Sequence, residues 1–408
     1  MACTPGETGF ATLAEVTSYA ASLRAAAAAG TPLAGDLVAR SLARALADDR
    51  AAEAAEDFET LRAFVVARAH LPPKHWPTVK HGLDRLRSVV GEPGAPRFDK
   101  MFSRVLDGGR WRQAAAYAAE KHERETNHRP WVLLVMGCNG VRKTTSCFQA
   151  WFKQALAFSL GRTYTGPRED LPDGNNAFFR QLDFMMANVC NLEFARMYNS
   201  ACCSGSDDGR SNVDAYMQLK GAIFARYRGL CEMLGGLLLE SAAQRGMNVM
   251  LETSGKDIAS FHYVNYFFPS SHYRKLVVYF EINDVKHAEQ SVDGRMKREM
   301  ERGRDLVSRQ ATTVRDLMAV NCGGPYGGKQ LCAVEAAARA TWDKVTNPVL
   351  VGGRRLGKQG KRGERERRVV GVAVCADRDP RRFGPGGMVG GGCGCGGWWV
   401  GPPEHSSV

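Results

Sequence analysis

The sequence predicts an α/β fold, in which a doubly wound parallel sheet follows an all-helical N-terminal region and precedes a disordered tail. Short apolar runs rich in β-forming residues occur at 131–136, 247–252 and 275–282. Helical segments separate these runs, including one around 213–244. Strands that alternate with helices build a parallel sheet, which binds ligands at the carboxyl ends of its strands.

Residues 1–128 form the predicted helical N-terminal region. The segment is dense in Ala, Leu, Arg and Glu, which are strong helix formers. Leu33, Leu37, Leu42 and Leu46 recur at nearly helical spacing. The region carries no recognisable chemistry, so we expect it to pack or to bind a protein partner.

The domain expected to carry the chemistry spans 129–346, and the tail spans 347–408. Residues 346–408 hold 16 of the 44 Gly, with eleven Lys/Arg and five Asp/Glu. Such a composition buries too little apolar surface to offset its ordering entropy, so the tail is predicted to be disordered. The tail carries +6 of the net charge of +12. Because half of the charge lies there, the basic composition argues against a nucleic-acid ligand.

The cellular setting follows from the cysteines and the hydropathy. The 12 Cys show no disulfide-framework spacing, and the first residues lack a secretory leader. Buried thiols in a reducing compartment account for them. No run reaches about 18 apolar residues, so no membrane span is expected. The predicted location is the cytoplasm, with organellar targeting left open.

The loop after the first strand has the composition of a phosphate-binding loop. It reads Gly-Cys-Asn-Gly-Val-Arg-Lys-Thr-Thr over residues 137–145. Small residues let backbone amides wrap a β-phosphate, a Lys reaches the β and γ oxygens, and a Ser/Thr hydroxyl holds Mg²⁺. The predicted nucleotide-binding residues are Gly137, Asn139, Gly140, Val141, Arg142, Lys143, Thr144 and Thr145, with Lys143 also catalytic and Thr144 a metal ligand. The loop thus predicts a P-loop NTPase-type sheet that uses ATP and Mg²⁺.

One position departs from the usual pattern, because Arg142 stands where Gly normally precedes the Lys. A side chain there either obstructs the phosphate or points away from it, or it contacts the phosphate itself.

Carboxylates further along the chain are candidates for the acceptor side of a phosphoryl transfer. Asp183 follows a short apolar run and is the candidate catalytic base, or else the N-cap of a helix over 184–197. Glu252 closes the strand at 247–251 and is assigned, with Thr253, to substrate binding. The alternatives for Glu252 are a contact to water-bridged Mg²⁺ or a solvated strand end.

An Arg-rich helix is predicted from about 285 to 305. Arg on a mobile segment can neutralise charge that develops on a transferred phosphoryl group. Arg295 and Arg304 are the candidate catalytic residues. Glu299 and Glu301 lie nearby, so a solvated salt-bridge face is the competing interpretation.

Together, the loop, the Asp183 segment, the strand 248–252 and the Arg-bearing segment 291–309 resemble the zeta-toxin group of P-loop kinases. The resemblance covers about residues 130–345, and the Asn-Gly-Val-Arg-Lys-Thr-Thr form is similar to a subgroup in which Arg142 is a regular feature. The resemblance implies ATP and Mg²⁺, with Asp183 as base, Glu252 as substrate contact and the Arg residues as phosphoryl stabilisers. In bacterial members the acceptor is a hydroxyl of UDP-N-acetylglucosamine, but no substrate motif here carries that acceptor over.

The sequence therefore predicts an ATP-dependent kinase acting on a small-molecule hydroxyl. The alternatives are a nucleotide-dependent ATPase or switch, and a pseudokinase scaffold whose helical region binds a partner.

Overall fold

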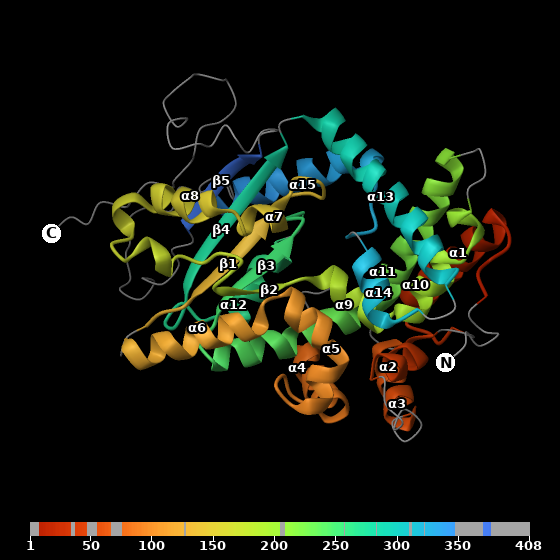
Figure 1. The fold of residues 1–408 in the computed structure, drawn as a ribbon, viewed down its shortest axis with the longest axis horizontal. Helices are drawn as coiled ribbons and strands as arrows, with labels where there is room; N and C mark the ends of the chain where they lie inside the picture. The colour runs from red at the N-terminus through yellow and green to blue at the C-terminus, as the bar shows by residue number, and fades with distance from the viewer. Residues whose placement is uncertain are drawn as a thin grey trace, which may run out of the picture. The chain divides into compact units, whose positions relative to one another are not determined.

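The structure is a computed structural model, and it describes residues 8–33, 37–46, 55–66, 76–125, 128–204, 209–256, 258–282, 284–309, 312–321, 323–346 and 370–376 (Figure 1). The chain divides into two compact units. The helical unit comprises Met1–Gly109, Arg180–Ser241 and Glu289–Lys329. The sheet unit comprises Arg110–Phe179, Ala242–Ala288 and Gln330–Val408.

The sheet has five strands in the order β2-β3-β1-β4-β5 (Figure 1). The strands β3, β1, β4 and β5 run parallel to one another. The central strand β1 is buried at every residue, as a strand covered on both faces must be. The bounds are β1 Trp131–Met136, β2 Ala177–Arg180, β3 Asn248–Thr253, β4 Arg274–Ile282 and β5 Val370–Ala376. The α/β class with a parallel sheet is thereby confirmed.

Helices of the sheet unit connect these strands and pack on them. The helix α12 contacts β1, and α8 contacts β5. The helices are α6 Trp111–Arg124, α7 Lys143–Cys147, α8 Ala150–Leu160, α12 Ala259–Phe267 and most of α15 Gly328–Thr346. The segment at about 143–160 has the helical character that its composition indicates, but it forms two helices, because Gln149 between α7 and α8 has an extended backbone.

The helical unit is built from the N-terminal helices and two later stretches of chain. Its helices are α1 Leu13–Ala29, α2 Val38–Leu46, α3 Ala55–Val66, α4 Trp76–Val90, α5 Pro96–Gly108, α9 Leu182–Val189, α10 Asn191–Tyr198, α14 Val314–Val320 and most of α11 Gly209–Gln244 and α13 Val285–Val307. The helix α2 packs against α3, α5, α9 and α10. The predicted helical character of the N-terminal region therefore agrees with α1 to α6, but these compact units do not follow the three consecutive segments that the sequence suggested.

The predicted disordered tail contains one described segment. Residues 370–376 form β5, which pairs in parallel with β4 from Leu276↔Val370 to Ile282↔Ala376. The run Val-Val-Gly-Val-Ala-Val-Cys at 369–375 is rich in β-branched residues, which suit a strand. The Gly-rich and basic composition around it hid this signal. The rest of 347–408 lies outside the described residues.

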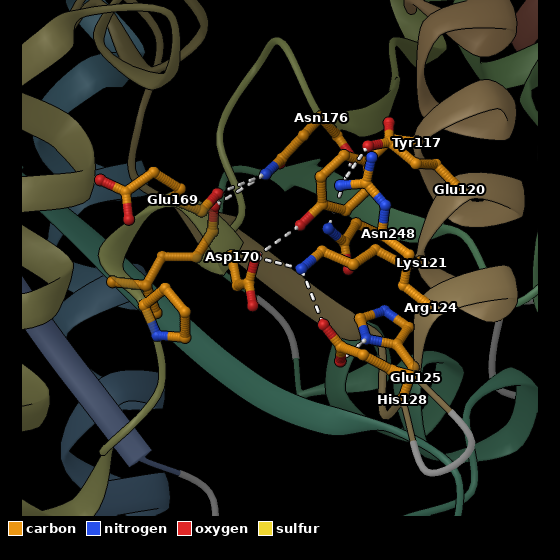
Figure 2. A network of polar contacts seen from close by, with 12 residues as sticks. Tyr117, Glu120, Lys121, Arg124, Glu125, His128, Glu169, Asp170, Asn176 and Asn248 are labelled. Carbon is orange, nitrogen blue, oxygen red and sulfur yellow. Dashed lines mark hydrogen bonds and ion pairs between the residues drawn. The ribbon is translucent and has the colours of Figure 1, made fainter.

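A polar network fastens α6 to the loop before β2 (Figure 2). Lys121 Nζ lies 2.6 Å from Asp170 and donates to Glu125 at 2.9 Å. Tyr117 donates to Asp170 at 3.3 Å. His128 Nδ1 lies 3.3 Å from the Glu125 carboxylate. Because these groups are partly buried, their charges interact more strongly than they would in water. The network therefore holds α6 against the loop that contains Asp170.

The network makes the stability of the sheet unit dependent on pH through His128. Burial is the largest influence on its imidazole and lowers its pKa, although the hydrogen bond with Glu125 opposes that shift. A lowered pKa means that the unfolded chain binds the proton first as the pH falls. The native state therefore loses stability as the pH drops below the ordinary histidine pKa of about 6.5.

We expect the urea midpoint of the protein to fall between pH 7.5 and pH 5.5, and His128→Gln to reduce that fall. The exposed His287 in the same unit provides the control, since His287→Gln should leave the fall unchanged. An unaltered pH dependence in the His128 variant would contradict the assignment.

Candidate functional site

The loop after β1 makes a sharp turn that depends on two glycines. Gly137 has φ 138° and Gly140 has φ 91°, both in the region that side chains disfavour. A Cβ on Gly137 would lie 2.5 Å from the carbonyl oxygen of Phe280 in β4. The loop can therefore leave the sheet only where residue 137 has no side chain.

Arg142 adopts a left-handed conformation, which Gly accepts more readily than other residues. Its φ is 57° and its ψ is 28°, which is left-handed, and its side chain is exposed. A left-handed backbone at this position is one that Gly adopts at lower cost than Arg does, and the Arg142 side chain is exposed to solvent. Of the possibilities raised by the sequence, obstruction by the Arg142 side chain is not what this geometry shows.

The first two residues of α7 meet a carboxylate from the neighbouring strand. Lys143 is only 4 % exposed, and its Nζ lies 3.2 Å from Glu252 Oε1. The Thr144 hydroxyl donates to Glu252 Oε2 at 3.0 Å. Lys143 also donates to the carbonyl oxygens of Gly137 at 2.7 Å and Cys138 at 2.9 Å. One carboxylate thus binds both loop residues that the sequence assigned to phosphate and metal.

The register of the sheet explains this meeting. Val135 of β1 pairs with Glu252 of β3, and Met136 pairs with Thr253. Because parallel strands end at the same edge, the loop after β1 begins beside the residues that close β3. Glu252, assigned from the sequence to substrate binding, thus lies against the loop.

The underside of the loop rests on residues that the sequence did not single out. The Cys138 thiol is fully buried, and burial followed by the nearby Glu335 carboxylate raises its pKa. Tyr279 of β4 donates to Glu335 at 2.7 Å. Glu335 is brought here by α15, so only the tertiary structure could reveal it.

The other predicted loop residues have less specific surroundings. Val141 is buried, Asn139 and Gly140 are half-buried, and Thr145 is exposed. The Thr253 hydroxyl lies 3.0 Å from the Ser260 hydroxyl and accepts from the Gly255 amide at 3.1 Å. Thr253 therefore closes the turn after β3 in this structure.

The helical unit brings Asp183 and Arg295 together. A Cβ placed on Gly323 would lie 3.3 Å from Asp183 Oδ2 and 3.3 Å from Arg295 Nη1. The carboxylate and the guanidinium therefore border the same small space. Asp183 lies in the first turn of α9, whose N-cap is Gln181, so the alternative of an Asp183 N-cap is wrong. In the chain it comes three residues after β2, the neighbour of β3 in the sheet.

The remaining residues of the Arg-rich helix have different surroundings. Arg304 is exposed and pairs loosely with Asp305 at 3.7 Å. Among the described residues, no contact joins Arg304 to Asp183 or Arg295. Glu299, which the sequence treated as part of a solvated face, is fully buried. That interpretation is wrong for Glu299, whose carboxylate accepts from three buried donors.

Several features bear on cofactors and on the class of protein. Within the described ranges, no group of three or more His, Cys, Asp and Glu side chains is placed to hold a metal ion. No described helix is both long enough and apolar enough to cross a membrane. Six described cysteines are buried thiols and Cys332 is exposed; the buried ones are Cys138, Cys147, Cys190, Cys202, Cys203 and Cys231.

Comparison with protein-family models, curated proteins and solved structures finds no match to this chain.

The left-handed conformation of Arg142 predicts how substitutions there change stability. Arg142→Gly should raise the free energy of unfolding by up to about 1 kcal/mol, because relief of left-handed strain exceeds the entropic cost of Gly. Arg142→Val should lower it by about 1–2 kcal/mol, since a β-branched residue disfavours this conformation further. Urea denaturation measures both. A destabilising Arg142→Gly would show instead that the Arg side chain stabilises the loop.

Proposed function

We propose that this protein is an ATP-dependent phosphotransferase with a P-loop NTPase-type core, acting on a hydroxyl of a small molecule. The observation that carries the proposal is the contact of Glu252 with both Lys143 and Thr144. A Lys, a hydroxyl and a carboxylate joined at the ends of two adjacent parallel strands suit a nucleotide phosphate with its metal.

The loop supplies the groups that a triphosphate requires. The first amides of a helix have no acceptor within that helix, and α7 begins at Lys143. Lys143 is the only charged group buried in the loop among the described residues. Its ammonium donates to two loop carbonyls and contacts Glu252. In the proposed complex it exchanges a loop carbonyl for phosphate oxygens.

The residues also fit Mg²⁺. This ion prefers oxygen ligands, keeps several waters and is bound in phosphate sites by few protein groups. The Thr144 hydroxyl would hold it, and Glu252 would bind one of its waters. When bound, Mg²⁺ would neutralise charge on the phosphates.

Asp183 and Arg295 are the proposed residues for the acceptor chemistry. A carboxylate can orient or deprotonate a hydroxyl, and a guanidinium can neutralise charge on the transferred phosphoryl group. Their shared position at Gly323 supports assigning both to one step. Arg304 has less support, because its side chain is exposed.

The zeta-toxin-like resemblance supports the same reaction class but leaves the acceptor open. A nucleotide sugar is the first candidate to test. A nucleotide-dependent ATPase or switch, with the helical region binding a partner, would use the same loop with water as acceptor.

The decisive experiment measures ATP binding and ADP release by the full chain, with Mg²⁺ and with or without a panel of nucleotide sugars and metabolites. Lys143→Ala should weaken ATP binding at least about 100-fold, because it removes a charge-assisted phosphate contact. The matched control is Lys275→Ala. Lys275 lies at the N-terminal end of β4, whereas the loop lies at the carboxyl ends of the strands, so this variant should bind ATP as the wild type does.

ADP release that requires both Lys143 and one acceptor would support the kinase and identify its substrate. Acceptor-independent release would support the ATPase or switch. Failure of the wild-type chain to bind ATP with Mg²⁺ would overturn the proposal and leave a scaffold.

Glu252→Gln tests the carboxylate separately from the loop. Removal of the negative charge beside Lys143 should tighten Mg²⁺-free ATP binding about 5- to 10-fold, since about 1 kcal/mol of local repulsion is lost. The same change should abolish the gain in affinity that Mg²⁺ gives the wild type. Isothermal titration with and without Mg²⁺ measures both effects, and equal Mg²⁺ dependence in the two proteins would show that Glu252 has no metal role.

A further inference from the structure

The helical unit contains a buried ion pair that the proposed reaction does not use directly. Lys220 of α11 and Glu299 of α13 are both 0 % exposed, and Lys220 Nζ lies 2.6 Å from Glu299 Oε1. Tyr198 and Tyr216 donate to the same oxygen at 3.0 and 2.6 Å. Burial, followed by the Glu299 charge, raises the pKa of both tyrosines, so they remain donors.

One of the Lys220 hydrogen bonds leads out of this cluster. Lys220 Nζ donates to Asn321 Oδ1 at 2.9 Å, and Asn321 is itself only 5 % exposed. The other end of that amide, Asn321 Nδ2, donates to the backbone oxygen of Asp183 at 2.8 Å. Asn321 Oδ1 also accepts from the Gly323 amide at 3.4 Å.

Both residues held by Asn321 border the space shared with Arg295. Asp183 supplies the carboxylate, and Gly323 supplies the position where any Cβ would crowd that carboxylate and the guanidinium. Arg295 stands four residues before Glu299 on α13, so the two occupy one side of that helix. The ion pair, the Asn321 amide and Asp183 are therefore joined by consecutive hydrogen bonds within one unit, and Arg295 borders the same space as Asp183.

We propose that Lys220 is a positioning residue, which sets Asp183 and Gly323 through Asn321 for the phosphoryl transfer. The inference rests on the proposed function for its kinetic consequence. Glu299 holds the buried Lys220 Nζ in place, and the hydrogen bond from Nζ to Oδ1 then orients the Asn321 amide. Because the amide group is planar, fixing its oxygen also fixes the direction in which its nitrogen donates to Asp183.

Two variants interrupt this chain at different points. Asn321→Asp preserves an acceptor for Lys220 but removes the donor to Asp183. Lys220→Met combined with Glu299→Gln removes the hydrogen bond from Lys220 to Asn321 without leaving a buried charge unpaired. The oxygen of the new Gln side chain still accepts from Tyr198 and Tyr216. The matched control is Tyr198→Phe, which removes one hydrogen bond to the same carboxylate but leaves Lys220 and Asn321 joined.

The experiment combines kinetics with hydrogen–deuterium exchange on the full chain. Kinetics follow ADP release from MgATP in the presence of the nucleotide-sugar panel. For both link variants we expect kcat to fall about 100-fold with KM for ATP within about 3-fold, since a misplacement of about 1 Å is enough for such a loss. Exchange of the peptide containing Gly323 should accelerate at least about 10-fold. Tyr198→Phe should change neither quantity.

The inference is overturned if the link variants keep wild-type exchange and kcat, or if Tyr198→Phe matches them in both. Should the wild-type chain release no ADP, the exchange comparison alone decides the inference, and failure to bind ATP would in addition overturn the proposed function. Lys143→Ala separates the two conclusions further, because it should abolish ATP binding while leaving exchange at Gly323 unchanged.

Discussion

The contact of Glu252 with Lys143 and Thr144 is the interaction on which the candidate nucleotide site depends. Burying a Lys that is 4 % exposed is costly unless an anion and hydrogen-bond acceptors offset the loss of water. The sheet provides that anion by pairing Val135 with Glu252, so the strand that precedes the loop and the strand that neutralises it end together. The parallel register of β1 and β3 thus places Glu252 beside both Lys143 and Thr144.

The helical unit also buries a Lys, and there the charge is compensated by a different set of partners. Lys220 and Glu299 are fully buried, and two tyrosines and an asparagine complete their hydrogen bonds. Buried ion pairs contribute little net stability, yet breaking one is costly. Such a pair therefore serves better to hold one arrangement of neighbouring groups than to stabilise the fold. In each unit, a buried Lys paired with a Glu organises residues that the sequence singled out for chemistry.

Local pattern was sufficient for much of the fold. The run at 131–136 was predicted as a strand and forms β1 with those bounds, and the strands ending at Glu252 and Ile282 agree within a residue or two. Each is a short apolar run that contains Val, and a run of this length favours a buried strand over a helix. The extended backbone at Gln149 and the strand β5 were not predicted. The β-branched run of β5 stands in a Gly-rich and basic segment that masks it, and its pairing with β4 identifies it as a strand.

The sequence by itself determined the phosphate-loop motif, the α/β class and the order in which the chemical groups occur along the chain. These follow from the spacing of Gly137, Lys143 and Thr144 and from hydrophobic periodicity, which are local properties. Tertiary structure alone decided that Glu252 faces the loop, that Arg142 is left-handed and exposed, and that Glu299 is buried beside Lys220. The physical reason is that charge pairing and burial depend on residues a hundred or more positions apart, as with Thr144 and Glu252.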